Sequence, residues 1–289
     1  MHKKISGLND ALNTATNALK NSQNALQKSQ AVNQLNAQTR QKMVDNLLFP
    51  NGVQNLAIRQ VNVGDCYLLS SLYALSRNKK GQDIIRKMVT ISDDGKILVK
   101  FHNQAPISVN TNCGAGQIIN GVKKHTSFSN LGVKAIEAAY GKYRAGLSGA
   151  GNIKALQAIN GGWADEAWKV LAGLKTTTHG VYKNGSFNSQ KMSIDKVLNT
   201  LADDMNNRII MAATPPGSYG ILKQVRNGEI IGWMDNTRKF ICQHAYAVSN
   251  IDKVNKTVTV VNPWNTTVGH TISYDEFSKI FGVIQEAVV

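Results

Sequence analysis

The feature of this sequence that most constrains its fold is a polar, glycine-containing turn that leads directly into an apolar segment, over residues 60–72. The spacing of the leucines in and after this segment predicts one apolar helix face, made of Leu68, Leu69, Leu72 and Leu75. Asp65 is the predicted N-cap, and Cys66 then lies in the first turn. Unpaired N–H groups and the helix dipole at that place lower the pKa of a thiol and favour the thiolate, which is the nucleophile. Taken alone, a cysteine in a leucine-rich helix is more often a buried core residue.

Length and cysteine content limit the class of protein. A chain of 289 residues can bury a large core and predicts one or two domains. No run approaches the ~18 consecutive apolar residues of a membrane span, and the basic start of the chain lacks the apolar region of a Sec-type signal peptide. Cys66, Cys113 and Cys242 cannot all pair, and their spacing fits no zinc site. We therefore expect free thiols in a reducing compartment.

The net charge of +15 predicts an acidic partner, a nucleic acid or an anionic membrane surface. The 33 lysines and arginines are scattered, however, without an arginine-rich arm or aromatic residues interleaved with basic ones. We therefore expect a solvated basic surface and no nucleic-acid partner.

Residues 1–50 differ in composition from the rest of the chain, because they are rich in Asn, Gln, Ala, Ser and Thr and contain no aromatic residue before Phe49. Leu12, Leu19 and Leu26 stand seven residues apart and predict an amphipathic helix. Two interpretations stay open: a helix that packs on its own protein or is partly disordered, or a segment for secretion, a secretion chaperone or an acidic partner. Turn-forming residues at 49–52 predict a boundary near residue 50.

Beyond this boundary, a helix-rich part over residues 51–162 precedes a strand-rich part over residues 163–289. Gly161-Gly162 is the predicted hinge between them. The expected helices run from Cys66 to a stop at residues 78–81, and over residues 84–88, 130–145, 153–159, 163–171, 192–207 and 274–281. The expected strands are residues 96–101, 107–110, 209–213, 229–234, 244–251, 257–261 and 282–284, with a loop at residues 114–121.

A histidine and an asparagine are predicted to meet at one edge of the late hairpin, because His244 opens one strand and Asn262 ends the other. A cysteine thiolate needs a neighbouring imidazolium, and the imidazole needs a third group that fixes its tautomer. We expect the side-chain oxygen of Asn262 to accept the Nδ1–H of His244, with Pro263 holding the backbone extended and Trp264 covering the bond. Each residue alone also fits a structural role, but the order Cys, His, Asn is that of papain-like cysteine peptidases.

These motifs resemble the calpain family of cysteine peptidases. The resemblance lies in residues 60–69, in residues 244–248 (His-Ala-Tyr-Ala-Val) and in Asn262-Pro263-Trp264. Residues 134–143, 147–149 and 161–162 are similar to the family's segment between its two core subdomains, and residues 274–277 to the stretch that closes the core. The similarity covers about residues 52–286. It implies a papain-like α+β core of two subdomains, one helical and one antiparallel β, with an N-terminal helical extension.

The resemblance also implies a role for each matching residue. Cys66 resembles the nucleophile, His244 the general base and acid, and Asn262 the residue that orients the histidine. Gln60 resembles the side-chain donor of the oxyanion hole, which acts beside the backbone N–H of Cys66. The supporting residues that it implies are Gly64, Asp65 and Trp264.

The sequence departs from the family at several positions. Tyr67 stands where calpains usually carry Trp, and Asn265 replaces the glycine that usually follows the Asn-Pro-Trp motif. Animal calpains bind calcium through acidic clusters, one of them just past that motif, whereas residues 261–270 here contain no Asp or Glu. Because calcium takes six to eight oxygen ligands, mostly from carboxylates, we expect a site that assembles without calcium, another metal or a cofactor.

Together these features predict a calpain-like cysteine endopeptidase that acts on protein or peptide substrates. A deamidase or acyltransferase that modifies protein side chains would use the same Cys-His-Asn machinery. A third alternative is an inactive protease fold that binds an acidic partner through its basic surface. We expect a bacterial protein that stays in the cytoplasm or is exported without a cleaved Sec signal, as an effector delivered into another cell.

Overall fold

The computed structural model describes residues 2–61, 63–92, 94–110, 117–119, 122–124, 129–146, 152–180, 193–214, 225–226, 229–232, 240–241 and 243–289. The features predicted at Cys113, Cys242 and residues 114–116, 120–121, 147–149, 192 and 233–234 lie outside these residues. The chain divides into one unit of residues 1–47 and another of residues 48–289. A further division at residue 162 stays a prediction.

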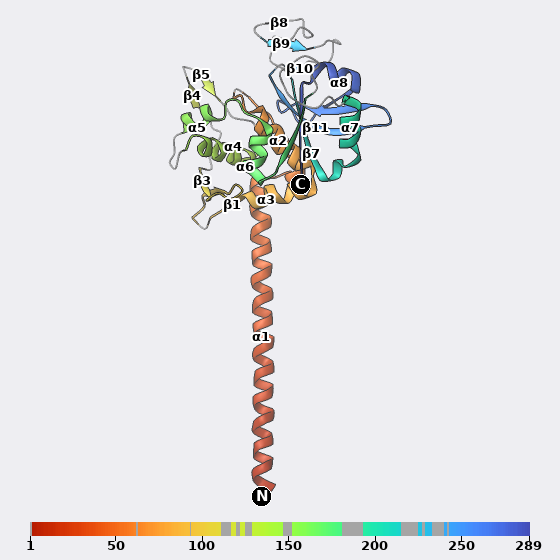
Figure 1. The fold of residues 1–289 in the computed structure, drawn as a ribbon. Coiled ribbons are helices and arrows are strands. Elements are labelled where there is room, and N and C mark those ends of the chain that lie inside the picture. The colour runs from red at the N-terminus through yellow and green to blue at the C-terminus, as the bar shows by residue number, and fades with distance from the viewer. Residues whose placement is uncertain are drawn as a thin grey trace. The chain divides into compact units, whose positions relative to one another are not determined.

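Helix α1 (His2–Leu48), drawn in red in Figure 1, makes up the first unit. The helical prediction for this segment is confirmed, whereas its role in secretion or partner binding stays a prediction. Several large apolar side chains along it are exposed, namely Leu19, Leu26, Val32, Leu35 and Met43. None of the helices formed by the described residues combines the length and apolar character that a membrane span needs.

A six-stranded antiparallel sheet organises the second unit, with the strand order β13-β12-β11-β7-β14-β6. The strands are β6 (Thr176–Gly180), β7 (Arg208–Ala213), β11 (Ala245–Asp252), β12 (Thr257–Val261), β13 (Gly269–Ser273) and β14 (Val283–Val288). β7 and the hairpin of β11 and β12 confirm predicted strands, and β14 extends the predicted strand at 282–284. β6 and β13 were not predicted, because both lie at sheet edges and their mostly polar side chains show no apolar alternation.

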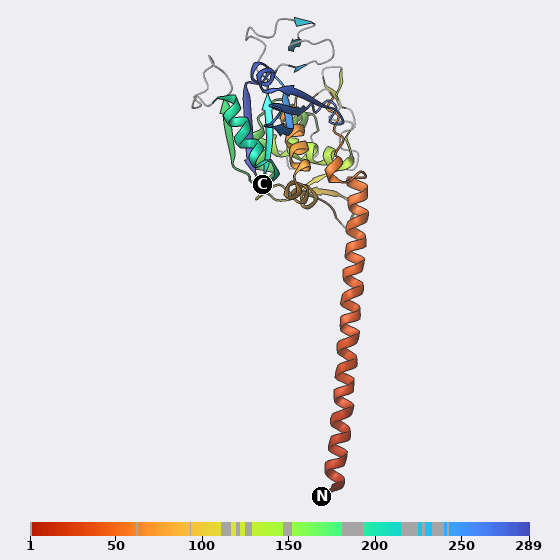
Figure 2. The same cartoon turned by 90° about the vertical axis from the view of Figure 1, so that its right-hand side faces the viewer.

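Alternating side chains give the sheet two packed faces. One face forms a core with α7 (Ile194–Asp203) and α8 (Tyr274–Ile280), and this core includes Ile210, Ala212, Tyr246, Val248 and Phe277. The other face lies against α2 (Cys66–Arg77), where Ser70 Oγ donates to Ala245 O at 2.9 Å. Figures 1 and 2 show α2 and α7 on opposite sides of β7 and β11. The small side chains of Ala245 and Ala247 let α2 lie close to the sheet.

The start of α2 and its end beside the predicted stop at residues 78–81 agree with the prediction, but Gly81 has a different role from the predicted one. The helix stops at Arg77, and α3 (Lys79–Met88) follows at once. Asn78 separates the two helices because its side-chain oxygen accepts from the backbone N–H groups of Lys80 and Gly81, at 2.9 and 3.2 Å. Gly81 therefore belongs to the first turn of α3 and is no C-terminal stop. A Cβ there would lie 2.2 Å from Leu75 O, which explains the glycine.

The other elements are three helices, the smaller sheets and two 3₁₀ turns. The helical predictions at 130–145, 153–159 and 163–171 are confirmed by α4 (Leu131–Arg144), α5 (Asn152–Ala158) and α6 (Ala164–Ala172). The smaller sheets contain β1 (Val89–Ile91), β2 (Ile97–Val99) and β3 (Ile107–Val109); β4 (Gln117–Ile119) and β5 (Val122–Lys124); and β8 (Val225–Arg226), β9 (Glu229–Gly232) and β10 (Phe240–Ile241). The 3₁₀ turns are η1 (Val53–Asn55) and η2 (Met205–Asn207). β4 corrects the loop predicted at 114–121, and the helix predicted over 192–207 divides into α7 and η2. The α+β class is confirmed, with most of the described helices before residue 173 and most of the described strands after it.

Candidate active site

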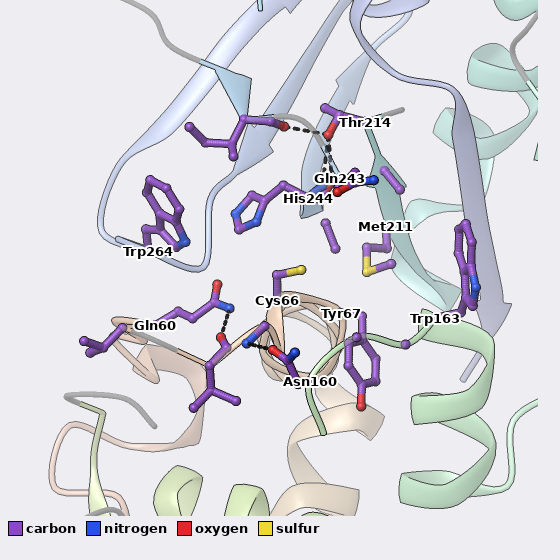
Figure 3. A pocket seen from close by; sticks show the side chains of 18 residues that line it. Gln60, Cys66, Tyr67, Asn160, Trp163, Met211, Thr214, Gln243, His244 and Trp264 are labelled. Atoms are coloured by element: carbon purple, nitrogen blue, oxygen red, sulfur yellow. Dashed lines mark hydrogen bonds between the residues drawn. The ribbon is translucent and has the colours of Figure 1, made fainter. Parts of the chain in front are cut away.

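A cavity of about 700 Å³ opens where the start of α2 meets the ends of β7 and β11. Figure 3 shows Gln60 and Cys66 on one wall and His244 and Trp264 on the opposite wall. The fold thus brings four of the residues singled out in the sequence to one hollow, although the helix and the hairpin that carry them are far apart in the chain.

Cys66 is the first residue of α2, but its surroundings do not favour the thiolate. Burial raises the pKa of the thiol to about 11, and the charge of Asp65 adds to this effect. The backbone N–H groups of Ala245, Tyr67 and Cys66 itself act in the opposite direction and do not compensate. The prediction that the helix start lowers this pKa is therefore wrong for the structure described, because loss of hydration outweighs the helix-end donors.

Asp65 occupies the N-cap position as predicted, and its carbonyl oxygen accepts from the N–H groups of Leu68 and Leu69 at 2.9 and 3.0 Å. Its side chain makes no capping hydrogen bond, however. The carboxyl group is instead fully buried behind the pocket wall, where it accepts from Gln60 Nε2 at 3.1 Å.

His244 and Asn262 meet as predicted, but through the other ring nitrogen. His244 Nε2 and Asn262 Oδ1 are 2.8 Å apart, whereas the sequence interpretation placed the bond at Nδ1. The backbone N–H of Trp264 also donates to Asn262 Oδ1, at 2.9 Å, which identifies this atom as the amide oxygen. Nε2 therefore carries the proton in the neutral imidazole, and Nδ1 keeps the lone pair that a general base needs.

Trp264 covers the histidine with an edge-to-face contact, with 5.3 Å between the ring centroids, and is itself 41% exposed. His244 is only 6% exposed. Burial lowers its pKa to about 4, although the bond to Asn262 acts in the opposite direction. With the pKa of Cys66 at about 11, both side chains are neutral at pH 7 in this arrangement.

Gln60 lies beside Cys66, but its amide hydrogens are already engaged. Nε2 donates to Val63 O at 2.7 Å and to Asp65 Oδ1 at 3.1 Å. Oε1 is buried and has no hydrogen-bond partner among the residues that the structure describes. Buried polar groups are normally paired. A substrate or a water molecule in the cavity would therefore donate the missing hydrogen bond to Oε1.

The loop that precedes Cys66 is held by residues that the sequence did not single out as functional. Gly64 N donates to Asn160 Oδ1 at 2.9 Å, and Gly161 N donates to Gly64 O at 2.8 Å. A Cβ on Gly64 would lie 2.6 Å from Asn160 Oδ1, so this close approach requires glycine. The position of Asn160 directly before the Gly-Gly pair was the only signal of its role. The hinge predicted at this pair stays a prediction.

Thr214 was also missed, and it holds the backbone of His244. His244 N donates to Thr214 Oγ1 and Thr214 N donates to His244 O, each at 3.0 Å. The preceding residue, Gln243, has a left-handed backbone with φ of 51°, a conformation that persists only when the surroundings impose it. Thr214 lies next to His244 only because β7 pairs with β11, so local sequence carries no signal of it.

The segment that carries Gln60 is tied to the loop that carries Asn262. Gln60 N donates to Pro263 O at 2.8 Å, and Ile58 N donates to Thr266 Oγ1 at 2.7 Å. Gln60 and Asn262 therefore lie on segments that are held together by backbone hydrogen bonds. No group of three or more His, Cys, Asp or Glu side chains within the described ranges could hold a metal ion.

Comparison with known protein families gives one match. The family model described as calpain family cysteine protease matches residues 10–279 of the chain. A search among curated proteins finds no match. The family match includes every residue of the pocket described above and most of α1, and so begins earlier than the resemblance seen in the motifs.

Proposed function

Because the chain belongs to the calpain family of cysteine proteases, with the papain-like α+β core of that family, we propose that it is an endopeptidase that works through Cys66, His244 and Asn262. The observation that carries the proposal is the hydrogen bond of 2.8 Å between His244 Nε2 and Asn262 Oδ1, on a histidine that faces Cys66 across the cavity. This bond gives the imidazole the tautomer that accepts a thiol proton.

In the proposed mechanism, Nδ1 of His244 takes the proton of Cys66, and the thiolate attacks the carbonyl carbon of the scissile peptide bond. The oxyanion that forms is stabilised by the backbone N–H of Cys66 and by the Gln60 amide, which must release one of its present acceptors. His244 then protonates the leaving amine. Water attacks the resulting thioester, with His244 as the base, and frees the acid product.

The first step is uphill by about 10 kcal/mol in the arrangement described, since the pKa of the thiol is about 11 and that of the imidazole about 4. A thiolate and an imidazolium stabilise each other when they approach, which lowers the first pKa and raises the second. We infer that substrate binding narrows the cavity, with Gly161-Gly162 as the hinge, and that this movement activates the nucleophile.

Calcium binding, which the family resemblance implies for animal members, does not fit the residues present. Residues 261–270 run from the end of β12 through a loop into β13, and they supply no carboxylate. Six to eight oxygen ligands, mostly carboxylate, would be needed there. We therefore propose that the site assembles without calcium.

The test is cleavage of unfolded casein, followed by mass spectrometry of the products. Cys66→Ala should abolish the new chain termini, and Cys113→Ala, which removes a different thiol, should retain them. An uncut chain with the mass increase of a deamidated or acylated side chain would replace the endopeptidase by a deamidase or acyltransferase. No product of any kind, together with no labelling of Cys66 by an epoxysuccinyl peptide, would indicate an inactive binding fold.

We also propose that residues 1–47 direct the protein to an exporter, a secretion chaperone or an acidic partner, so that it works in the cytoplasm or after export without a cleaved Sec signal. This role is supported by the long helix, which has exposed apolar side chains and few acidic residues. Deletion of residues 1–47 should reduce export and leave peptide cleavage intact. Unchanged export would contradict this role.

A further inference from the structure

The loop of residues 160–162 is hydrogen-bonded on two sides. Gly161 N donates to Gly64 O at 2.8 Å, and Gly161 O accepts from Arg144 Nη1 at 2.9 Å. Gly161 has a positive φ of 89°, and a glycine adopts many other backbone conformations as readily. The loop therefore keeps its position through these external partners, and Arg144 is the partner that does not belong to the turn before Cys66.

Arg144 also bonds to the helix that carries Cys66. Its Nη1 donates to Tyr67 Oη at 2.6 Å, and Tyr67 is the second residue of α2. A Cβ on Gly162 would lie 2.5 Å from the Tyr67 ring and 2.9 Å from Arg144 Nη1, so the loop passes directly over this pair. Figure 3 shows Tyr67 on the same wall of the cavity as Cys66. One guanidinium group thus joins the loop to the residue that follows Cys66.

The ion pair of Arg144 contributes less than these two hydrogen bonds. Glu166 lies 3.6 Å from Arg144, but the Glu166 side chain is 51% exposed. Water competes for both charges of an exposed pair, so such pairs stabilise a protein little. The Arg144 side chain is 25% exposed, and hydrogen bonds from a charged donor are about twice as strong as neutral ones. The loop and Tyr67 are therefore the groups that Arg144 holds most firmly.

Arg144 lies outside the cavity that contains Cys66. It lines a second cavity of about 990 Å³, together with Tyr143, and the described residues that line the two cavities do not overlap. We therefore expect no direct contact between Arg144 and a substrate bound at Cys66. The loop residues Gly161 and Gly162 do line the Cys66 cavity, so a shift of the loop changes the wall that receives a substrate.

We propose that Arg144 is a positioning residue, which holds the loop of residues 160–162 against the turn before Cys66. The loop in turn holds Gly64 through two hydrogen bonds, of 2.9 and 2.8 Å. Without Arg144, we expect the loop to leave this turn, so that the backbone N–H of Cys66 loses its fixed direction. This inference rests on the proposed function, in which that N–H stabilises the oxyanion.

The experiment measures kcat and KM of Arg144→Ala with a fluorogenic peptide taken from a casein site that the wild-type protein cleaves. The concentration of active protein is measured as the amount of Cys66 that an epoxysuccinyl peptide labels. We expect kcat/KM to fall about 10- to 100-fold, with a higher KM and a lower kcat per labelled site, because both the turn and the cavity wall shift. A merely structural role predicts fewer labelled sites, with KM and the kcat per labelled site unchanged.

Arg86→Ala is the matched control. The Arg86 side chain is 33% exposed and its Nη1 lies 3.0 Å from Asp83, but it lines neither of the two cavities described. This variant loses an arginine of similar exposure that does not hold the loop. It should therefore keep kcat and KM within about twofold of wild type.

Added guanidinium ion supplies the group that Arg144→Ala lacks. The gap left by the side chain opens to the second cavity, and guanidinium at about 50 mM is far below the molar concentrations that unfold proteins. It should raise kcat/KM of Arg144→Ala about fivefold and leave wild type and Arg86→Ala unchanged. The same concentration of sodium chloride should change none of the three. A variant whose loss comes from unfolding gains nothing from a denaturing ion.

Tyr67→Phe removes one of the two acceptors and keeps the aromatic ring. We expect kcat/KM to fall about 3- to 10-fold, and we expect guanidinium to restore none of this loss. The double variant Arg144→Ala/Tyr67→Phe should lie within about twofold of Arg144→Ala, since both changes break the same bond. Independent roles predict instead that the two losses multiply.

Three outcomes would each overturn the inference: unchanged KM and kcat per labelled site in Arg144→Ala, no recovery of that variant with guanidinium, or multiplied losses in the double variant. If Arg144→Ala does not fold, Tyr67→Phe decides alone, and an unchanged kcat/KM in it overturns the inference.

The wild-type protein separates this inference from the proposed function. Cleavage by the wild type beside an unaffected Arg144→Ala refutes only the inference. Labelling of Cys66 without cleavage refutes the endopeptidase, and the rate of labelling then decides the inference, because it should fall in Arg144→Ala and recover with guanidinium. A wild-type protein that shows neither labelling nor cleavage refutes both.

Discussion

Replacing Asn262 by alanine removes the acceptor of two hydrogen bonds, one from His244 Nε2 at 2.8 Å and one from Trp264 N at 2.9 Å. His244 is 6% exposed, so its Nε2–H would be left buried without a partner. An intramolecular hydrogen bond contributes about 1 kcal/mol, and an unpaired buried donor costs about 1–3 kcal/mol more. The imidazole also loses its preference for the tautomer with a free Nδ1. We expect kcat to fall about 30- to 1,000-fold, the equivalent of about 2–4 kcal/mol.

The assay is hydrolysis of a fluorogenic peptide taken from a casein site that the wild-type protein cleaves, analysed for kcat and KM separately. KM should change little because Asn262 does not line the cavity. Asn265→Ala is the matched control, since this asparagine lies in the same loop but, among the described residues, its side chain accepts only from Thr267, through N at 3.2 Å and Oγ1 at 2.7 Å. A loss of less than about threefold in folded Asn262→Ala, or an equal loss in Asn265→Ala, would refute the assigned orienting role.

Three further predictions follow from the same structure. Alkylation of Cys66 by iodoacetamide in the free protein should accelerate with pH towards about 11, because burial favours the neutral thiol; a constant rate from acid to neutral pH would show a preformed thiolate–imidazolium pair. Gly162→Ala would place a Cβ 2.5 Å from the ring of Tyr67, and should lower the free energy of unfolding in urea by about 1–3 kcal/mol; unchanged stability would mean that the ring moves freely. Peptide cleavage should be the same in excess chelator and in added calcium, since residues 261–270 offer no carboxylate; a calcium requirement would contradict independent assembly.

Most of the elements that position the site could be predicted, because each has a strong local period. The leucines of α2 and the alternation of β11 and β12 are apolar patterns on buried elements. The edge strands β6 and β13 were not predicted because their side chains are mostly polar. These segments become strands by hydrogen bonding to the neighbouring strand of the sheet. Asn78 ends one helix and caps the next, and the sequence alone did not separate these two roles.

Within the site, the meeting of His244 and Asn262 could be predicted because they lie at the same end of one hairpin. The sequence could not predict which ring nitrogen of His244 bonds to Asn262, since the ring orientation depends on packing against Trp264 and Tyr246. The sequence also predicted the wrong direction for the pKa shift of Cys66. A helix start is a local feature, but the burial that outweighs it arises where the sheet covers α2.

By itself, the sequence predicted the residues of the proposed chemistry and determined the elements on which they lie, because periodicity and motif order are properties of neighbours along the chain. Only the tertiary structure decided the charge states of Cys66 and His244, the inward turn of Asp65 towards Gln60, and the support of Gly64 by Asn160. The physical reason is that desolvation and hydrogen bonding depend on atoms that are close in space and distant in sequence.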